Sequence, residues 1–166
     1  MSDLVVTRWG ARFCGRKLRC AIGRGGMTTD KREGDGGTPV GIYPFSDFTF
    51  FHRPDQVGGP GRAIRRWDIW SDDPEDVAYN SLGQHPARGR YGFGHEAMWR
   101  GDRLYDVVID IGQNQNPAVP GRGSAIFIHH WRKPRHPTEG CVAFAPQDLR
   151  WILEHASVRD RLVILG

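Results

Sequence analysis

The run Ser124-Ala125-Ile126-Phe127-Ile128-His129-His130 and the turn His136-Pro137-Thr138-Glu139-Gly140-Cys141-Val142 decide the fold and the chemistry of this chain. The first run is apolar and rich in β-branched and aromatic residues, and it predicts a buried strand over residues 124–129. The second places a Gly-Cys step after a polar turn and before a segment with helical spacing. We therefore expect one strand and one turn to bring a histidine and a cysteine together.

The segments on both sides of this pair predict mainly strands. Residues 104–112 alternate and predict a core strand, residues 4–9, 11–14 and 17–22 predict extended segments with a hairpin at Gly15, and residues 161–165 predict a final strand. Residues 147–155 have helical spacing, with Pro146 near the start. Residues 52–66 and 114–123 predict loops, 67–80 an ordered loop and 95–99 one helical turn. The predicted class is mostly β, a sandwich or barrel-like sheet with one main helix near the C-terminus.

The bulk composition fits one soluble globular domain over residues 1–166. The formal net charge is +4, but the basic residues are dispersed, so we expect no nucleic-acid partner. No apolar run reaches the length of a transmembrane segment. The glycine-rich stretch at residues 23–37 lacks the Gly-Lys-Ser/Thr ending of a phosphate-binding loop, so nucleotide binding is not expected either. We expect a monomer.

Cys141 is the predicted nucleophile. Gly140 leaves the backbone open to a substrate, so the N–H groups of Gly140 and Cys141 are predicted to face a developing oxyanion. Backbone amides at a loop-to-helix junction would lower the pKa of the thiol. His129 is the predicted base, because alternation puts His130 on the opposite face of the strand, and Pro137 beside His136 indicates a solvent-facing loop.

The other cysteines and histidines suggest less. Cys14 and Cys20 fit either one disulfide bridge in an oxidising compartment or two small buried residues on neighbouring strands. No Cys-x-x-Cys occurs, and the adjacent His129 and His130 suit a shared tetrahedral site poorly. We therefore expect no metal and no other cofactor.

Three segments in order resemble the L,D-transpeptidase catalytic domain, also called the YkuD family. Residues 31–44, Lys-Arg-Glu-Gly-Asp-Gly-Gly-Thr-Pro-Val-Gly-Ile-Tyr-Pro, are similar to its charged Gly-Asp stretch followed by Thr-Pro-x-Gly-x-aromatic. Residues 126–129 are similar to its histidine strand. Residues 138–142, Thr-Glu-Gly-Cys-Val, are similar to its Ser/Thr-His-Gly-Cys-aliphatic motif.

The resemblance implies a cysteine acyltransferase that cross-links peptidoglycan stem peptides in bacterial cell-wall biogenesis and cell-shape maintenance. By carry-over, Cys141 attacks a carbonyl of the donor stem, His129 is the general base, and the amides of Gly140 and Cys141 form the oxyanion hole. An amine of a second stem resolves the thioester. Glu139 departs from the family histidine and is assigned an orienting role, toward His129 or an incoming ammonium group. Residues expected to flank the substrate are Tyr79, Asn80, His95, Arg122 and Ser124.

Two alternatives stay open from the sequence. A thiol carboxypeptidase or endopeptidase of the same fold would trim stem peptides with water. A module without catalysis would bind peptidoglycan or nucleic acid. Residues 1–7 lack the pattern of an export signal, yet the substrate implied by the resemblance places the protein in the cell envelope or periplasm.

Overall fold

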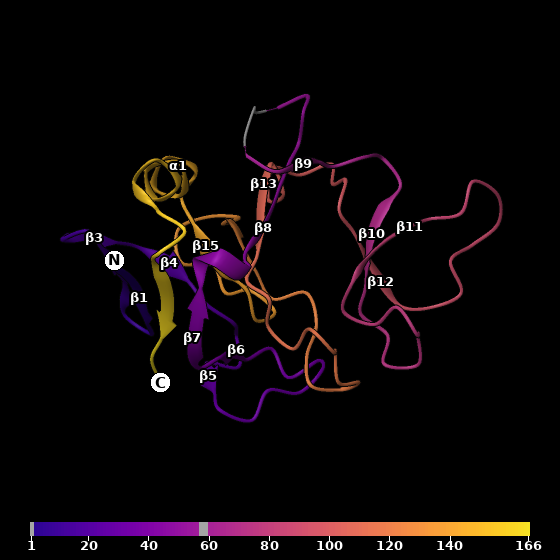
Figure 1. Ribbon diagram of the computed structural model, residues 1–166, viewed down its shortest axis with the longest axis horizontal. Coiled ribbons are helices and arrows are strands. Elements are labelled where there is room, and N and C mark those ends of the chain that lie inside the picture. The colour runs from indigo at the N-terminus through magenta and orange to yellow at the C-terminus, as the bar shows by residue number, and fades with distance from the viewer. Residues whose placement is uncertain (1, 57–59) are drawn as a thin grey trace.

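The computed structural model describes residues 2–56 and 60–166 and shows three larger sheets side by side with one helix above them (Figure 1). A fourth sheet has only two strands. The mostly β class and the single helix near the C-terminus are confirmed. The sheets are open, so the sandwich-like alternative describes them better than a barrel. Within the described part of the chain, no helix combines the length and the apolar character that crossing a membrane requires.

The first sheet has five strands in the order β3-β2-β1-β16-β7. Their bounds are β1 Asp3–Thr7, β2 Gly10–Phe13, β3 Arg16–Leu18, β7 Gly41–Pro44 and β16 Arg161–Ile164. The predicted hairpin is confirmed, with Cys14 and Gly15 at φ +43° and +79° in its turn. The first and last strands of the chain pair in parallel, with Leu4 opposite Leu162.

The second sheet is central and carries the histidine strand. Its six strands follow the order β4-β15-β14-β13-β8-β9. Their bounds are β4 Cys20–Ala21, β8 Thr49–His52, β9 Arg62–Ala63, β13 Val107–Asp110, β14 Phe127–His130 and β15 Val142–Phe144. The strand predicted at 17–22 is divided at Arg19, where the chain passes from the first sheet (β3) to the second (β4).

The third sheet is small, and the sequence did not indicate it. It consists of β10 Asp68–Ser71 between β11 Leu82–Gln84 and β12 His95–Ala97. The ordered loop predicted at 67–80 therefore contains a strand, and the helical turn predicted at 95–99 is wrong. Long-range pairing explains both errors, since β12 becomes extended only by pairing with β10. The loop predicted at 52–66 holds β9 at one end, and residues 57–59 of it lie outside the described residues.

The remaining elements are short except for the helix. β5 Met27–Thr28 pairs with β6 Thr38–Pro39, and a 3-10 turn, η1, spans Phe45–Asp47. Helix α1, Pro146–His155, begins with proline in its first turn and buries Leu149 and Ile152, as its spacing predicts.

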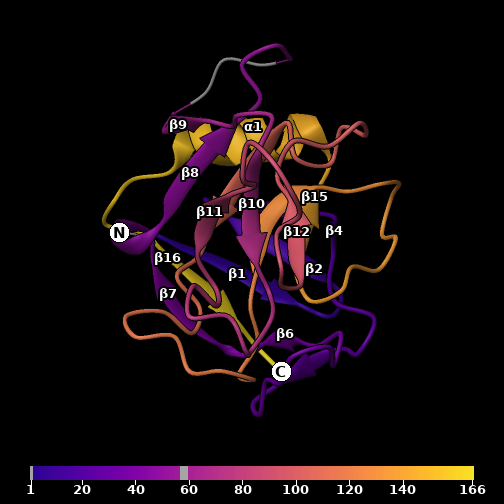
Figure 2. The same ribbon diagram turned by 90° about the vertical axis from the view of Figure 1, so that its right-hand side faces the viewer.

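Alternation along β14 and β15 divides the interior into two cores. Ile128, Val142 and Phe144 pack with the first sheet and α1, whereas Phe127 and Cys141 pack with Trp70 of β10 and with Met98. Since neighbouring residues of a strand face opposite sides, the central sheet is a wall between these cores. Figure 2 shows the small sheet in front of it and the first sheet behind. Cys141 and His129 belong to the side that faces the small sheet.

Candidate active site

The thiol of Cys141 lies at the start of β15, beside the first residue of β14. Because β14 and β15 run parallel, with Ile128 opposite Val142, Cys141 comes next to Phe127. The Phe127 N–H donates to Sγ at 3.4 Å, and the thiol donates to the Ala125 carbonyl at 3.2 Å. The residue is only 8% exposed. The backbone of the histidine strand therefore fixes the sulfur at the edge of the second core.

Burial makes this thiol a weak acid. It raises the pKa of Cys141 to about 12, the carboxylate of Glu96 acts in the same direction, and the Phe127 amide opposes both. The low pKa predicted for a loop-to-helix junction is wrong, because β15 follows Cys141 and α1 begins only at Pro146. The sulfur rests as a protonated thiol and needs a base to become a nucleophile.

His129 lines the same cavity and keeps one ring nitrogen that can accept a proton. Its Nδ1 lies 2.7 Å from the His130 carbonyl, which can only accept, so the ring proton is on Nδ1 and Nε2 keeps its lone pair. Tyr105 meets the imidazole edge to face, with ring centroids 5.3 Å apart. Burial lowers the pKa of His129 to about 4, so the ring is neutral at physiological pH.

Only His129 was expected to lie near Cys141, with His130 and His136 directed elsewhere, and the structure agrees in part. His129 lines the same cavity as Cys141, and His130 lines a separate cavity beneath α1, so alternation does separate them. His136, expected in a solvent-facing loop, is partly buried and lines the cavity of Cys141 as well. Pro137 beside it is exposed, so the turn itself is at the surface.

The cavity that contains Cys141 and His129 has a volume of about 570 Å³. Its walls come from segments between residues 33 and 141, and they include Glu33, Asp72, Glu96, Arg100, Tyr105 and Arg132. Tyr105 donates its hydroxyl to Glu96 at 2.7 Å, and burial raises the pKa of that carboxyl. Burial and the carboxylate of Glu33 likewise raise the pKa of Asp72. Asp72 and Glu96 were missed because they belong to a loop and to the small sheet, and no local pattern marks them. Glu33 lies in the charged segment of residues 31–44, but the sequence assigned no role to it.

No cluster of metal ligands accompanies this cavity. Within residues 2–56 and 60–166, no three His, Cys, Asp or Glu side chains come together as a metal ion requires.

Gly140 is held by the two threonines of the recognised motifs. Its N–H donates to Thr138 Oγ1 at 3.2 Å, and its carbonyl accepts from Thr38 Oγ1 at 2.8 Å. Its φ is +140°, and a Cβ there would come within 2.9 Å of the Gly37 carbonyl. Only glycine fits this position, because both the left-handed backbone and the close approach exclude a side chain.

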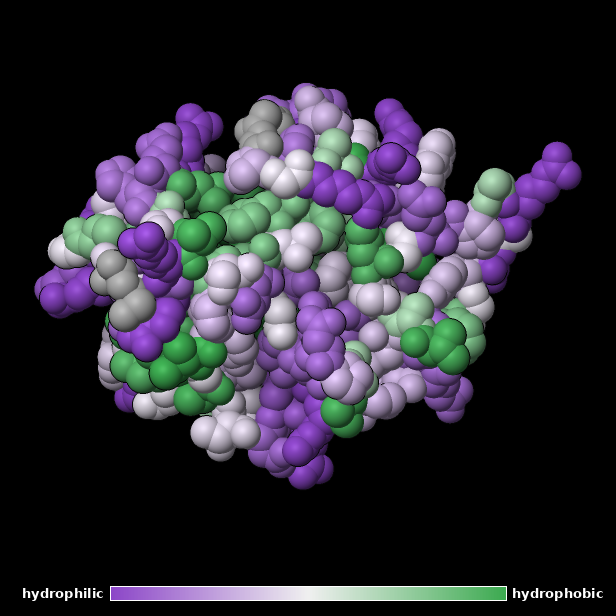
Figure 3. Space-filling view, in the orientation of Figure 1, coloured by the Kyte–Doolittle hydropathy of each residue, from purple (hydrophilic) through white to green (hydrophobic). Residues whose placement is uncertain are grey.

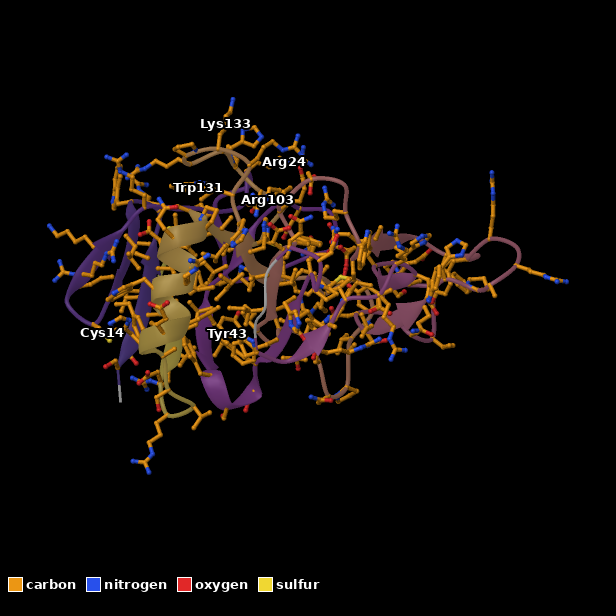
Figure 4. All side chains as sticks on the ribbon, turned by 90° about the horizontal axis from the view of Figure 1, so that it is seen from above. Cys14, Arg24, Tyr43, Arg103, Trp131 and Lys133 are labelled. Carbon is orange, nitrogen blue, oxygen red and sulfur yellow. The ribbon has the colours of Figure 1, made fainter. Side chains whose placement is uncertain are left out.

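Glu139 points away from the base that it was assigned to orient. Its carboxylate pairs with Arg24 at 2.9 Å, and both side chains are largely exposed. Figure 4 shows Arg24 at the edge of the molecule, near the loop that carries Trp131 and Lys133. The His130 carbonyl orients His129 instead. Glu139 nonetheless lines the cavity, on its outer side.

Of the five residues expected to flank the substrate, the structure brings two to the cavity, His95 and Ser124. Tyr79, Asn80 and Arg122 lie outside its lining among the described residues. Tyr79 donates to Glu33, and Arg122 pairs with Asp30 at 2.8 Å. Asn80 accepts from the Trp70 indole and the Ala125 amide, each at 3.0 Å. It therefore fixes the residue whose carbonyl contacts the thiol.

Comparison with known proteins assigns the fold to a family. The family model described as YkuD, L,D-transpeptidase catalytic domain, matches residues 6–164. The chain therefore belongs to the YkuD family, as the motifs around Thr38, His129 and Cys141 indicate.

The chain was also compared with solved structures and with curated proteins. A solved structure of an L,D-transpeptidase from Mycobacterium smegmatis is similar to the chain with a TM-score of 0.44 and 9% sequence identity. The match covers 99% of this chain and 58% of the other, so the chain spans little more than half the length of that protein. No curated protein matches the chain.

Proposed function

We propose that this chain is a peptidoglycan L,D-transpeptidase that forms cross-links through a thioester on Cys141. The family supports the reaction class, since its members act on peptidoglycan stem peptides. The observation that carries the proposal is the pairing in one cavity of a protonated, buried thiol with a neutral imidazole whose Nε2 is unprotonated. This pair supplies a nucleophile and the base that activates it.

The proposed first half-reaction acylates the enzyme. His129 Nε2 takes the thiol proton as Sγ attacks the donor carbonyl, so that a C–S bond forms. Collapse of the tetrahedral intermediate breaks the C–N bond, and the imidazolium gives its proton to the departing amine. The result is a thioester on Cys141 and a neutral His129.

The second half-reaction uses an amine of another stem. The amine attacks the thioester, His129 accepts its proton, and the new amide forms as the C–S bond breaks. The thiolate then recovers the proton from His129. If water takes the place of the amine, the same steps trim the donor stem and no cross-link forms.

The backbone N–H groups of Gly140 and Cys141 are proposed to stabilise the oxyanion. The Gly140 N–H makes a hydrogen bond of 3.2 Å with Thr138 Oγ1, at the long limit for such bonds, so sharing it with an oxyanion costs little. Thr138 in turn donates to the Cys141 carbonyl at 2.6 Å, which keeps the turn fixed.

Cys141→Ala provides the test, on purified muropeptides with mass spectrometry of the products. We expect dimers from the wild-type protein and a loss of at least roughly 10³-fold in the variant, because the nucleophile is removed. Dimers at the wild-type rate from Cys141→Ala would overturn the assignment. Shortened monomers without dimers from the wild type would replace transfer by hydrolysis.

A thiol probe separates catalysis from mere binding, and it needs the Cys14→Ser background. Cys14 is exposed and reacts with any thiol reagent, whereas burial raises the pKa of Cys20 to about 11. In that background, we expect a substrate-like acyl donor to label Cys141 and to fail with Cys141→Ala. The substrate also makes the cell envelope the proposed location, which fractionation of the native protein tests.

A further inference from the structure

A third cavity, of about 700 Å³, lies on the outer side of the small sheet. It is lined by residues from the approach to β10, from all three strands of this sheet, and from the loop that joins β11 to β12. Among them are Arg66, Trp67, Gln84, His85, Pro86 and His95. We call it the outer groove. That loop projects at the right of Figure 1, and Figure 3 shows this end as mainly hydrophilic with a few hydrophobic residues.

The outer groove contains both planar aromatic rings and hydrogen-bonding side chains. The Trp67 side chain is 59% exposed at the groove, although tryptophan is usually well buried. His85 and His95 meet edge to face with ring centroids 5.9 Å apart, and Tyr91 packs against His95 at 5.2 Å. Gln84 also lines the groove, and its amide N–H donates to Asp68 at 3.3 Å. An exposed indole offers an apolar face to the C–H side of a sugar ring, and amide and imidazole groups bond its hydroxyls.

The groove adjoins the cavity of the thiol. His95 lines both, and its backbone lies opposite Ser71 in the pairing of β10 with β12. Its Nδ1 lies 2.9 Å from the Phe93 carbonyl, a contact that fixes the orientation of the ring. A ligand that spans His95 would therefore contact the groove and the thiol cavity at once.

We propose that the outer groove binds the glycan strand of peptidoglycan, a chain of linked amino sugars, while the stem peptide attached to it enters the thiol cavity. The inference rests on the proposed function, because only a stem-peptide substrate carries such a strand. Holding the strand raises the effective concentration of the stem at Cys141. The exposed Arg88 and Arg90 of the same loop suit a polymer whose free stems carry carboxylates.

The backbone of Trp67 contributes to the groove independently of its side chain. Its carbonyl accepts the His85 N–H at 2.8 Å, and this bond survives replacement of the indole. Trp67→Ala is thus expected to fold, and Trp67→Phe keeps an aromatic face. Trp9 provides the matched control, since it is 70% exposed in the turn after β1. Strand β1 lies at the opposite end of the molecule from the small sheet (Figure 1).

The first test measures binding without turnover. In the Cys141→Ala background, soluble glycan strands stripped of stem peptides are titrated against the protein by equilibrium dialysis. Trp67→Ala should weaken binding roughly tenfold, the effect of losing part of one aromatic contact. Trp67→Phe should retain most of the affinity, and Trp9→Ala all of it. Absence of binding, or equal loss in Trp67→Ala and Trp9→Ala, overturns the proposal.

The second test compares a free stem peptide with the same stem carried on a glycan strand. Trp67→Ala should raise KM for the strand-bound stem roughly tenfold and leave kcat and the free stem unchanged. Equal effects on both substrates overturn the groove. If the protein turns over stem peptides but does not bind strands, the glycan-binding role of the groove is wrong and the transpeptidase assignment stands. If strands bind through Trp67 but no turnover occurs, the transpeptidase assignment is wrong and the glycan-binding role stands.

Discussion

The pair formed by Cys141 and His129 is neutral at rest, and this has a consequence for pH dependence. Burial lowers the pKa of His129 to about 4 from its ordinary value near 6.5. We therefore expect kcat/KM to stay level as the pH falls through 6.5 and to decline only near 4. A pH profile of the wild-type protein on a stem-peptide substrate measures this. An acidic limb at 6.5 would show that the ring is solvated and that the geometry is different.

The lowered pKa of His129 also makes the free energy of unfolding depend on pH. The folded protein buries the neutral ring, so acid destabilises it. A lowered pKa in the folded state means that the unfolded chain binds the proton first. The contribution is therefore complete above pH 6.5 and is lost as the pH falls toward 4. The variant His129→Asn cannot gain this charge. It should therefore lose less unfolding free energy than the wild type as the pH falls from 6.5 to 4, and urea titrations at several pH values measure this.

At the residue scale, the sequence predicts which side of a strand a residue faces better than it predicts what surrounds that residue. Alternation separates His129 from His130 because the period of a strand is two, and this is a local property. The environment of Cys141 is not local. Its raised pKa comes from burial and from Glu96, 45 positions away in the sequence, which only the pairing of the small sheet brings near. A low pKa was therefore predicted where a high one is found.

At the scale of elements, Thr38 connects two of the three recognised motifs. The side chain is fully buried, its hydroxyl donates to the Gly140 carbonyl at 2.8 Å, and it accepts the Gly23 N–H at the same distance. Its place in the Thr-Pro-x-Gly segment is thus explained by the turn that it fixes, 102 residues away. The resemblance located this residue, but its role needs the three-dimensional contact.

Thr38→Val removes both hydrogen bonds while keeping the shape of the side chain. The Gly140 carbonyl and the Gly23 amide then stay buried without a partner, which costs about 1–3 kcal/mol for each group. We expect a lower urea midpoint and a reduced kcat, since the turn before Cys141 loses its support. Thr38→Ser keeps the hydroxyl and serves as the control. Equal values for the Val and Ser variants would show that the bonds contribute nothing.

The small sheet is the element that sequence patterns failed to predict. β10, β11 and β12 are three or four residues long, and they contain a glycine and several polar or charged residues. Short strands of this composition carry little propensity of their own and form because they pair with one another. This sheet supplies Glu96 and His95 to the cavity. His95 was expected near the substrate from the sequence, but the error in predicting the sheet explains why Glu96 was missed.

At the scale of the whole molecule, the central sheet separates two cores, and the thiol of Cys141 packs in only one of them. Phe127 and Phe144 are both fully buried, on opposite sides of this sheet. Phe127 packs edge to face against Trp70, with centroids 4.9 Å apart, and shares its core with Cys141. Phe144 packs in the core beneath α1. The two side chains therefore make a matched pair for separating stability from the environment of the thiol.

Replacing either phenylalanine by alanine should cost about 3–5 kcal/mol of unfolding free energy, the usual loss for a buried aromatic ring. Only Phe127→Ala should also make Cys141 react faster with iodoacetamide in the Cys14→Ser background. The space that it leaves adjoins the sulfur, and hydration of that space lowers the pKa that burial has raised. Urea unfolding gives the first quantity, and alkylation rates of protein that circular dichroism shows to be folded give the second. Equal acceleration by Phe144→Ala would mean that general loosening, and not the second core, controls the thiol.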